Sequence, residues 1–237
     1  MPITGPTQSN ITSGTTAGTI SLNFLSPCFA GDFVAVAVAT NTGSGTTVSV
    51  VDALSNTYSQ AGGYIPQTNL VVSLWYSILV NGGTNAIVVT PSAGGHAALA
   101  LAEYTGVLGP TSGALDQASI GDAGTQAACD TNLVGVTATG ELVIGVFGQV
   151  TSGLPYTAVT GSVVQDFDCT ATKIGLCMVD LLNVSASVTP AGTYGSPSAL
   201  WAGIGASFFP AVPPPPPSGR VPWYYPTTPQ HQTVISM

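Results

Sequence analysis

The sequence offers few side chains that could catalyse a reaction. His96 and His231 are the only histidines in the 237 residues, and His231 lies close to the end of the chain. There is no G-x-S-x-G nucleophile motif, no phosphate-binding G-x-x-x-x-G-K-[ST] loop and no G-x-G-x-x-G turn opening a helix. His96 follows two glycines and is expected in a loop or at a strand edge. We therefore predict no catalytic residue and no enzymatic activity.

The ten carboxylates could act in pairs or bind a cation. Glu103 and Glu141 are the only glutamates, and two carboxyl groups about 5–10 Å apart are the machinery of glycoside hydrolysis. Nothing in their spacing brings them together, so strand-end carboxylates bound by backbone N–H groups are favoured. Asp166, Asp168 and Asp180 could bind calcium, because alternate residues of a strand share a face. A solvated acidic face is favoured there, and we predict no metal and no cofactor.

The four cysteines are too scattered for a disulfide scaffold, and none forms a C-x-x-C pair. If residues 172–174 form a turn, Cys169 and Cys177 lie opposite each other across a hairpin. This pair is the favoured disulfide, and buried small hydrophobic residues are the alternative.

Charge limits the choice of partners. Two basic residues, Lys173 and Arg220, stand against ten acidic ones, which gives a net charge of -8. Such a surface cannot neutralise phosphates, so binding to nucleic acid or to an anionic membrane is excluded.

The N-terminus, MPITGPTQSN, has no basic segment followed by an apolar one, and is not a secretory signal. No apolar run approaches the ~20 residues that cross a bilayer. We expect a soluble protein made in a cytoplasm without export.

The elements that position these residues are short β-strands. Eleven or more runs rich in Thr, Val, Ile and Tyr recur every ~8–12 residues, separated by Gly, Asn, Ser and Pro, and no helical period is visible. We predict an all-β fold, a two-sheet jelly-roll-like β-sandwich without a fixed-period repeat. Residues 33–40 are apolar on both faces and predict a central strand. Residues 70–80 alternate, which predicts one buried face and places Ser73 and Ser77 on the other.

Two polar motifs predict turns. Asp52 and Asn56 suit Asx-type turns, in which a short side chain accepts from backbone N–H groups. Asn81 and Asn85 flank two glycines that suit a hairpin joining the strands on either side. Tyr58, Tyr76, Tyr104 and Trp75 are interpreted as core or cross-strand aromatics.

These motifs resemble a loosely defined family in their order and spacing, over roughly residues 20–209. The resemblance rests on Asp52, Asn56 and Tyr58, the NGGTNAIVVT segment, Glu103-Tyr104-Thr105-Gly106, Leu115-Asp116 and GELVIG (140–145). The family comprises jelly-roll or concanavalin-like modules of secreted bacterial surface proteins and phage virion proteins. It implies a fold and a surface or virion setting, with no catalytic residue to transfer.

Composition divides the chain into an N-terminal extension (1–19), a sandwich domain (20–209) and an extended proline-rich C-terminal tail (210–237). Pro210 and the residues after it contain half of the prolines. The run of prolines predicts a polyproline II rod of ~15 Å, beside apolar groups that could anchor in a partner. The predicted partner-binding residues are Pro213, Pro214, Pro215, Pro216, Pro217, Trp223, Tyr224, Tyr225 and Ile235.

We therefore expect a structural virion component, most simply a phage capsid decoration or cement protein at the virion surface. Its expected partners are copies of itself and a particle lattice. A homo-oligomer is predicted, and the resemblance favours a trimer slightly over a dimer. The alternative is an extracellular or cell-surface carbohydrate-binding or adhesin module that binds a glycan. An enzyme acting on polysaccharide is the third possibility.

Overall fold

The computed structural model describes residues 2–16, 18–43, 46–63, 65–108, 113–150, 155–167, 174–196 and 199–212. All regular elements in these ranges are β-strands, and the strands pair in antiparallel sheets. The predicted all-β sandwich is therefore confirmed, although the strands form four sheets where two were expected. The described part of the chain contains no helix that could span a bilayer.

The first unit of the fold consists of the first nine strands. They are β1 (Thr4–Thr16), β2 (Ile20–Asn23), β3 (Phe33–Thr40), β4 (Val48–Asp52), β5 (Ser59–Gln60), β6 (Ile65–Gln67), β7 (Leu70–Ile78), β8 (Ala86–Pro91) and β9 (Gly95–Thr105). Its larger sheet has the order β1-β9-β3-β7-β5, with β6 also on β7, and its smaller sheet the order β2-β8-β4. The chain alternates between the two sheets from β1 to β4 and from β7 to β9, which is the winding of a jelly roll.

The second unit consists of the remaining nine strands. They are β10 (Leu115–Ala118), β11 (Asp122–Gly124), β12 (Ala128–Asp130), β13 (Glu141–Gln149), β14 (Tyr156–Thr160), β15 (Ser162–Phe167), β16 (Gly175–Val184), β17 (Ala191–Tyr194) and β18 (Trp201–Phe208). The order is β10-β18-β13-β16-β15 in the larger sheet, where β11 also pairs with β18, and β12-β17-β14 in the smaller. This topology matches that of the first unit, with β10 and β11 together in the place of β1, and β15 in the place of β5 and β6.

Strand register confirms that the two units are equivalent. In the first unit Phe33 of β3 lies opposite Tyr104 of β9, and in the second Leu142 of β13 lies opposite Phe208 of β18. No fixed-period repeat was predicted, so the duplication is a property of the structure that the hydrophobic pattern does not reveal.

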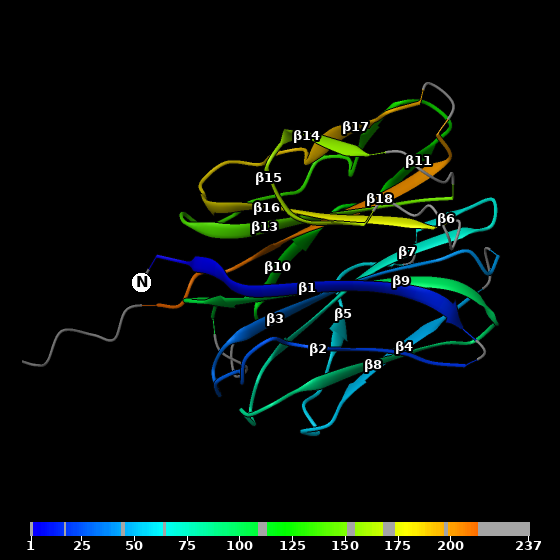
Figure 1. Ribbon diagram of the computed structural model, residues 1–237. Helices are drawn as coiled ribbons and strands as arrows, with labels where there is room; N and C mark the ends of the chain where they lie inside the picture. Colours follow the sequence, from blue (N-terminus) through cyan, green and yellow to red (C-terminus); the bar gives the residue numbers. More distant parts are fainter. Residues whose placement is uncertain are drawn as a thin grey trace, which may run out of the picture.

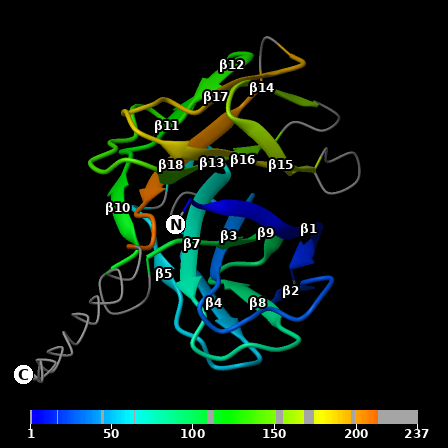
Figure 2. The same ribbon diagram turned by 90° about the vertical axis from the view of Figure 1, so that its left-hand side faces the viewer.

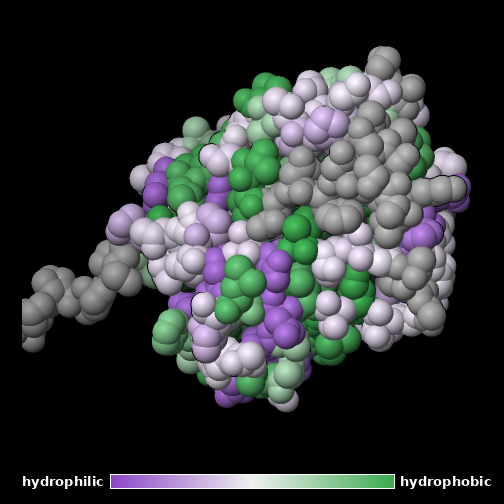
Figure 3. Space-filling view, viewed as in Figure 1, coloured by the Kyte–Doolittle hydropathy of each residue, from purple (hydrophilic) through white to green (hydrophobic). Residues whose placement is uncertain are grey.

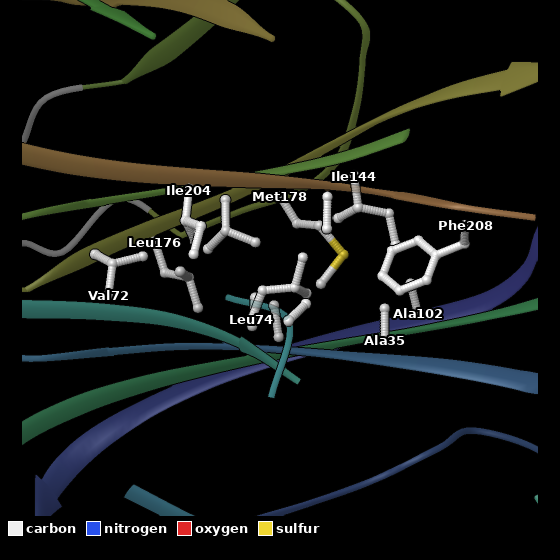
Figure 4. Packing of buried hydrophobic residues seen from close by; sticks show 14 of the residues in the cluster. Ala35, Val72, Leu74, Ala102, Ile144, Leu176, Met178, Ile204 and Phe208 are labelled. Atoms are coloured by element: carbon white, nitrogen blue, oxygen red, sulfur yellow. The ribbon is translucent and has the colours of Figure 1, made fainter. Parts of the chain in front are cut away.

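The four sheets are stacked as four layers (Figure 1, Figure 2). The two larger sheets face each other in the middle, and each smaller sheet covers the outer face of its own unit's larger sheet. The central core between the units is filled by side chains from both larger sheets. Figure 4 shows Val72, Leu74 and Ala102 from the first unit pointing toward Ile144, Leu176, Met178, Ile204 and Phe208 from the second.

The sequence of β3 follows from these layers. Its valines Val34, Val36 and Val38 point into the first unit, whereas its alanines Ala35, Ala37 and Ala39 point to the seam between the units. All eight residues are buried, which confirms the predicted central strand.

The prediction that one face of residues 70–80 is exposed was wrong. Ser73 of β7 is fully buried and Ser77 is 2% exposed, because the small β2-β8-β4 sheet covers that face. The hydroxyl of Ser73 accepts a hydrogen bond from the indole N–H of Trp75 at 3.1 Å, which offsets the cost of its burial.

The N-terminal segment belongs to the first unit and does not extend from it. Strand β1 pairs with β9 from Thr4 to Thr16 and forms the edge of the larger sheet. Its polar sequence is typical of an edge strand, half of whose surface faces solvent.

The hairpin predicted around Asn81 to Asn85 was also wrong, because β7 and β8 belong to different sheets. Gly82 instead packs on the backbone of the preceding loop, where a Cβ would lie 2.7 Å from the nitrogen of Ala30. Gly83 and Cys28 exchange backbone hydrogen bonds of 2.8 and 2.9 Å. The glycines thus allow the chain to change layers beside another loop.

The two units meet symmetrically after their last strands. Val107 and Pro210 form an isolated antiparallel bridge. The N–H of Leu108 donates to the carbonyl of Phe209 at 2.9 Å, and the N–H of Ala211 donates to the carbonyl of Gly106 at 2.7 Å. Since Val107 and Pro210 follow equivalent strands, a pseudo-twofold axis passes between them.

Candidate functional site

Equivalent acidic turns open the central strands β3 and β13. Gly31 and Gly140 have φ values of 94° and 87°, a left-handed conformation that favours glycine. Their N–H groups donate to the carbonyls of Leu79 and Val184, each at 2.8 Å. A glycine is therefore needed at the same place in both units.

The residue after each glycine is acidic, Asp32 in the first unit and Glu141 in the second. Each carboxylate accepts the N–H of the residue three positions earlier, from Phe29 to Asp32 and from Ala138 to Glu141. The side chain thus closes its own turn, and each turn places a carboxylate at one end of a jelly roll.

In the first unit, Asp32 lies beside the carboxyl group of Glu103, a residue of β9 that is 3% exposed. Glu103 Oε2 accepts hydrogen bonds from Gln8 Nε2 at 2.7 Å and from Thr7 Oγ1 at 3.1 Å, whereas Oε1 accepts none from the described residues. Burial and the neighbouring Glu103 raise the pKa of Asp32. Burial and Glu103 also raise the pKa of the Cys28 thiol, so this cysteine is not an activated nucleophile.

A cavity of about 330 Å³ opens onto this pair. Oxygen-bearing side chains line most of it, and the Phe29 ring at its edge is 73% exposed. The lining residues are Thr7, Gln8, Ser26, Pro27, Phe29, Asp32, Glu103 and Thr105.

The second unit contains a similar acid pair, Glu141 and Asp116, but backbone groups satisfy it more fully. The N–H of Thr137 lies 2.9 Å from Asp116 Oδ2 and 3.0 Å from Glu141 Oε1, so the two carboxylates share it. Burial raises the pKa of Glu141, with Asp116 adding to the effect. Burial would also raise the pKa of Asp116, but hydrogen bonds, chiefly from Thr137, lower it.

Asp52 forms the densest hydrogen-bond network around a carboxylate. It accepts from the backbone N–H groups of Leu54 and Asn56, from the side-chain amides of Asn56 and Asn85, and from the hydroxyl of Tyr58, at 2.7 to 3.2 Å. Burial opposes ionisation of Asp52, but these hydrogen bonds prevail and lower its pKa. The predicted Asx-type turn is confirmed, and the network leaves no free acceptor for a ligand.

Asp180 links the two units. It is 5% exposed and accepts a hydrogen bond of 3.1 Å from the hydroxyl of Tyr104, so the solvated face expected for this residue was wrong. Burial raises its pKa. The equivalent contact across the axis joins the rings of Tyr76 and Phe208, whose centroids are 5.2 Å apart.

The other predicted site residues fall into two groups. Glu103 and Glu141 lie in different units, each beside an aspartate of its own unit, so they do not form the hydrolytic pair. His96 is the second residue of β9 and is half-buried, so it lies in a strand between β1 and β3 and not in the loop or at the edge expected for it. Pro213 to Pro217, Trp223, Tyr224, Tyr225, Ile235, Asp168 and Cys169 lie outside the described residues.

The predicted disulfide therefore stays a prediction. Strands β15 and β16 do form a hairpin, in which Asp166 lies opposite Cys177. Within the described ranges, no three Asp, Glu, His or Cys side chains converge as metal ligands.

Comparisons of the chain with protein-family models, with curated proteins and with solved structures gave no match. The resemblance to jelly-roll modules of surface and virion proteins thus stays a prediction beyond the fold itself.

Sequence reasoning missed the equivalent acidic turns, although a signal was present. Identical residues recur 109 positions apart (117 − 8, 132 − 23 and 140 − 31), at Gln8/Gln117, Asn23/Asn132 and Gly31/Gly140. Asp32 and Glu141 have the same separation (141 − 32). Aligning the chain with itself at this offset would have pointed to the two equivalent turns.

Proposed function

We propose that this protein is a structural component of a larger particle, most simply a decoration or cement protein docked on a capsid lattice through its C-terminal tail. The observation that carries the proposal is the edge strand β1. It is 13 residues long and uncharged, and no strand pairs with its outer edge among the described residues. Solitary proteins guard such edges with charge, proline or a bulge; in β1, Pro6 and a register shift lie before Gln8, which leaves the uncharged stretch from Gln8 to Thr16 without these devices and favours a neighbour.

The rest of the surface supports the same function. Large hydrophobic residues are exposed around the molecule, and Figure 3 shows them scattered between polar ones on one face. They are Leu25, Phe29, Val51, Val80, Ile120, Leu133, Val159, Val163, Leu182 and Val212. A surface with so few charges is better suited to packing in an assembly than to isolation in solution.

Sedimentation of the full chain and of a chain ending at Val212 tests the proposal. The truncated chain keeps all described strands, since the last one ends at Phe208. We expect the full chain to associate at tens of micromolar and the truncated chain to stay monomeric with the same circular dichroism spectrum. A full chain that remains monomeric would refute the proposal.

A carbohydrate-binding module is the second candidate, and a cavity of about 500 Å³ favours it. Tyr76 supplies an aromatic surface there, beside the hydroxyl of Thr57 and the amide of Asn81. Aromatic rings combined with neutral polar groups suit sugars. A glycan array probed with the wild-type protein and with Thr57→Arg, which would fill the cavity mouth, tests this function.

A further inference from the structure

The carboxyl pair of Asp32 and Glu103 lacks a compensating charge. Glu103 is 3% exposed and lines the cavity, and its Oε1 accepts no hydrogen bond from the described residues. The chain has two basic residues, Lys173 and Arg220, and neither lies in the described ranges. A buried carboxylate without a cation or enough donors is costly, so the pair would gain from a cationic ligand.

The surroundings of the pair suit a planar cation. The cavity lies at the mouth of the first jelly roll, a common location for binding sites in β-barrels. A guanidinium group could donate to both carboxyl groups at once while stacking on the Phe29 ring, which is 73% exposed. An ammonium group would satisfy fewer of these acceptors.

The chain itself carries such a group in its tail. Arg220 stands three residues after Pro217 and three before Trp223, within the segment expected to anchor in a partner. The chain leaves the last strand close to the cavity. The N–H of Ala211 donates to the carbonyl of Gly106, and the preceding residue, Thr105, lines the cavity.

The run of prolines between the exit point and Arg220 favours a second molecule as the receptor. Five consecutive prolines, Pro213 to Pro217, start immediately after Val212. If these prolines form the polyproline II rod that the sequence predicts, the rod would span ~15 Å, which favours a cavity on a second molecule over the cavity beside the exit point.

We propose that the guanidinium of Arg220 of one molecule binds to the carboxyl groups of Asp32 and Glu103 of a neighbouring copy, beside Phe29. This inference rests on the proposed function, since it names the receptor for the docking tail. Arg220 is one of only two Lys and Arg residues in the chain, and this inference gives it a role.

The experiment measures the association constant of the full-length protein by sedimentation at low and physiological salt. We expect Arg220→Gln and Glu103→Gln each to weaken association about 30-fold or more, because either leaves a charge without its partner. The double variant should be little weaker than either single one, the signature of two groups in direct contact. The matched control is Lys173→Gln, which removes the other basic residue and should leave association unchanged.

Failure of this inference is distinct from failure of the proposed function. If Arg220→Gln associates like Lys173→Gln while the chain ending at Val212 is monomeric, the tail docks elsewhere and the inference is wrong. If Arg220→Gln lowers the melting temperature of a monomer, the contact lies within one chain and the inference is also wrong. A full chain that never associates would overturn the inference together with the proposed function.

Discussion

At the scale of single residues, the buried carboxylates differ in how well their surroundings stabilise the charge. Asp52 is held by five donors that favour its ionised form. Glu141 and Asp180, which are buried, and Asp32, which is half-buried, have fewer donors or lie beside another acid, and their pKa values are raised. The sequence could predict the turn at Asp52, because its partners lie nearby in the chain. It could not predict the Glu103 contact with Asp32, because strand pairing creates it.

Replacing Asp52 by Asn should destabilise the protein by about 2–3 kcal/mol, since an amide presents a donor to groups that already donate. The melting temperature measured by calorimetry checks this. Asp122→Asn is the matched control, because the Asp122 carboxylate bonds, among the described residues, only to the N–H of the adjacent Ala123, and its replacement should change stability little.

The raised pKa of Glu141 predicts how its contribution varies with pH. A folded-state pKa above the unfolded value near 4.3 means that the protonated form stabilises the fold. This contribution is complete below about pH 4 and is lost as the pH rises through the folded pKa. Asp52 and Asp116, whose pKa values are lowered, act in the opposite sense and lose their contribution as the pH falls below about 4.

Glu141→Gln should therefore flatten the decline in stability between pH 4.5 and 7.5, because glutamine keeps the acceptor for Ala138 and can donate toward Asp116. Melting temperatures at the two pH values decide this. An unchanged difference between them would show that Glu141 is ionised throughout.

At the scale of elements, side-chain size sets the distance between the two larger sheets. The seam is built from alanines on β3 and β9 opposite larger residues of β13, β16 and β18. The alternation of Val and Ala in residues 33–40 predicted a central strand, but not that its two faces meet different layers. The serines of β7 were predicted to be exposed for the same reason. A polar residue on a strand indicates a solvent-exposed face only where no further sheet covers that face.

Ala100 of β9 tests the seam, because it is fully buried in the core between the units. Ala100→Leu should destabilise the protein by about 1–3 kcal/mol through overpacking. Val163→Leu, at a position that is 45% exposed, is the control and should have almost no effect on chemical denaturation. Equal midpoints for the two variants would contradict a close-packed seam.

At the scale of the whole molecule, the units are joined by more than a linker. Their larger sheets share one core, Tyr104 bonds to Asp180 across it, and Val107 pairs with Pro210. Neither unit can unfold without exposing the core-facing surface of the other. The domain boundary predicted near residue 210 came from proline content, whereas no composition change marks the division between the units.

Thermal unfolding should accordingly occur in a single cooperative transition, with equal calorimetric and van't Hoff enthalpies. Differential scanning calorimetry of the truncated and full chains checks this. Two separate transitions would mean that the seam contributes little to stability.

The position of the last strand determines how the body would respond to force on its tail. Strand β18 is flanked on one side by β13 and on the other by β10 and β11, whereas β1 is held by β9 alone. A pull at Val212 must therefore break ladders on both sides of a strand and open the central core, while a pull at the N-terminus would peel off one edge. A molecule tethered by its C-terminus is thus held at its mechanically stronger end.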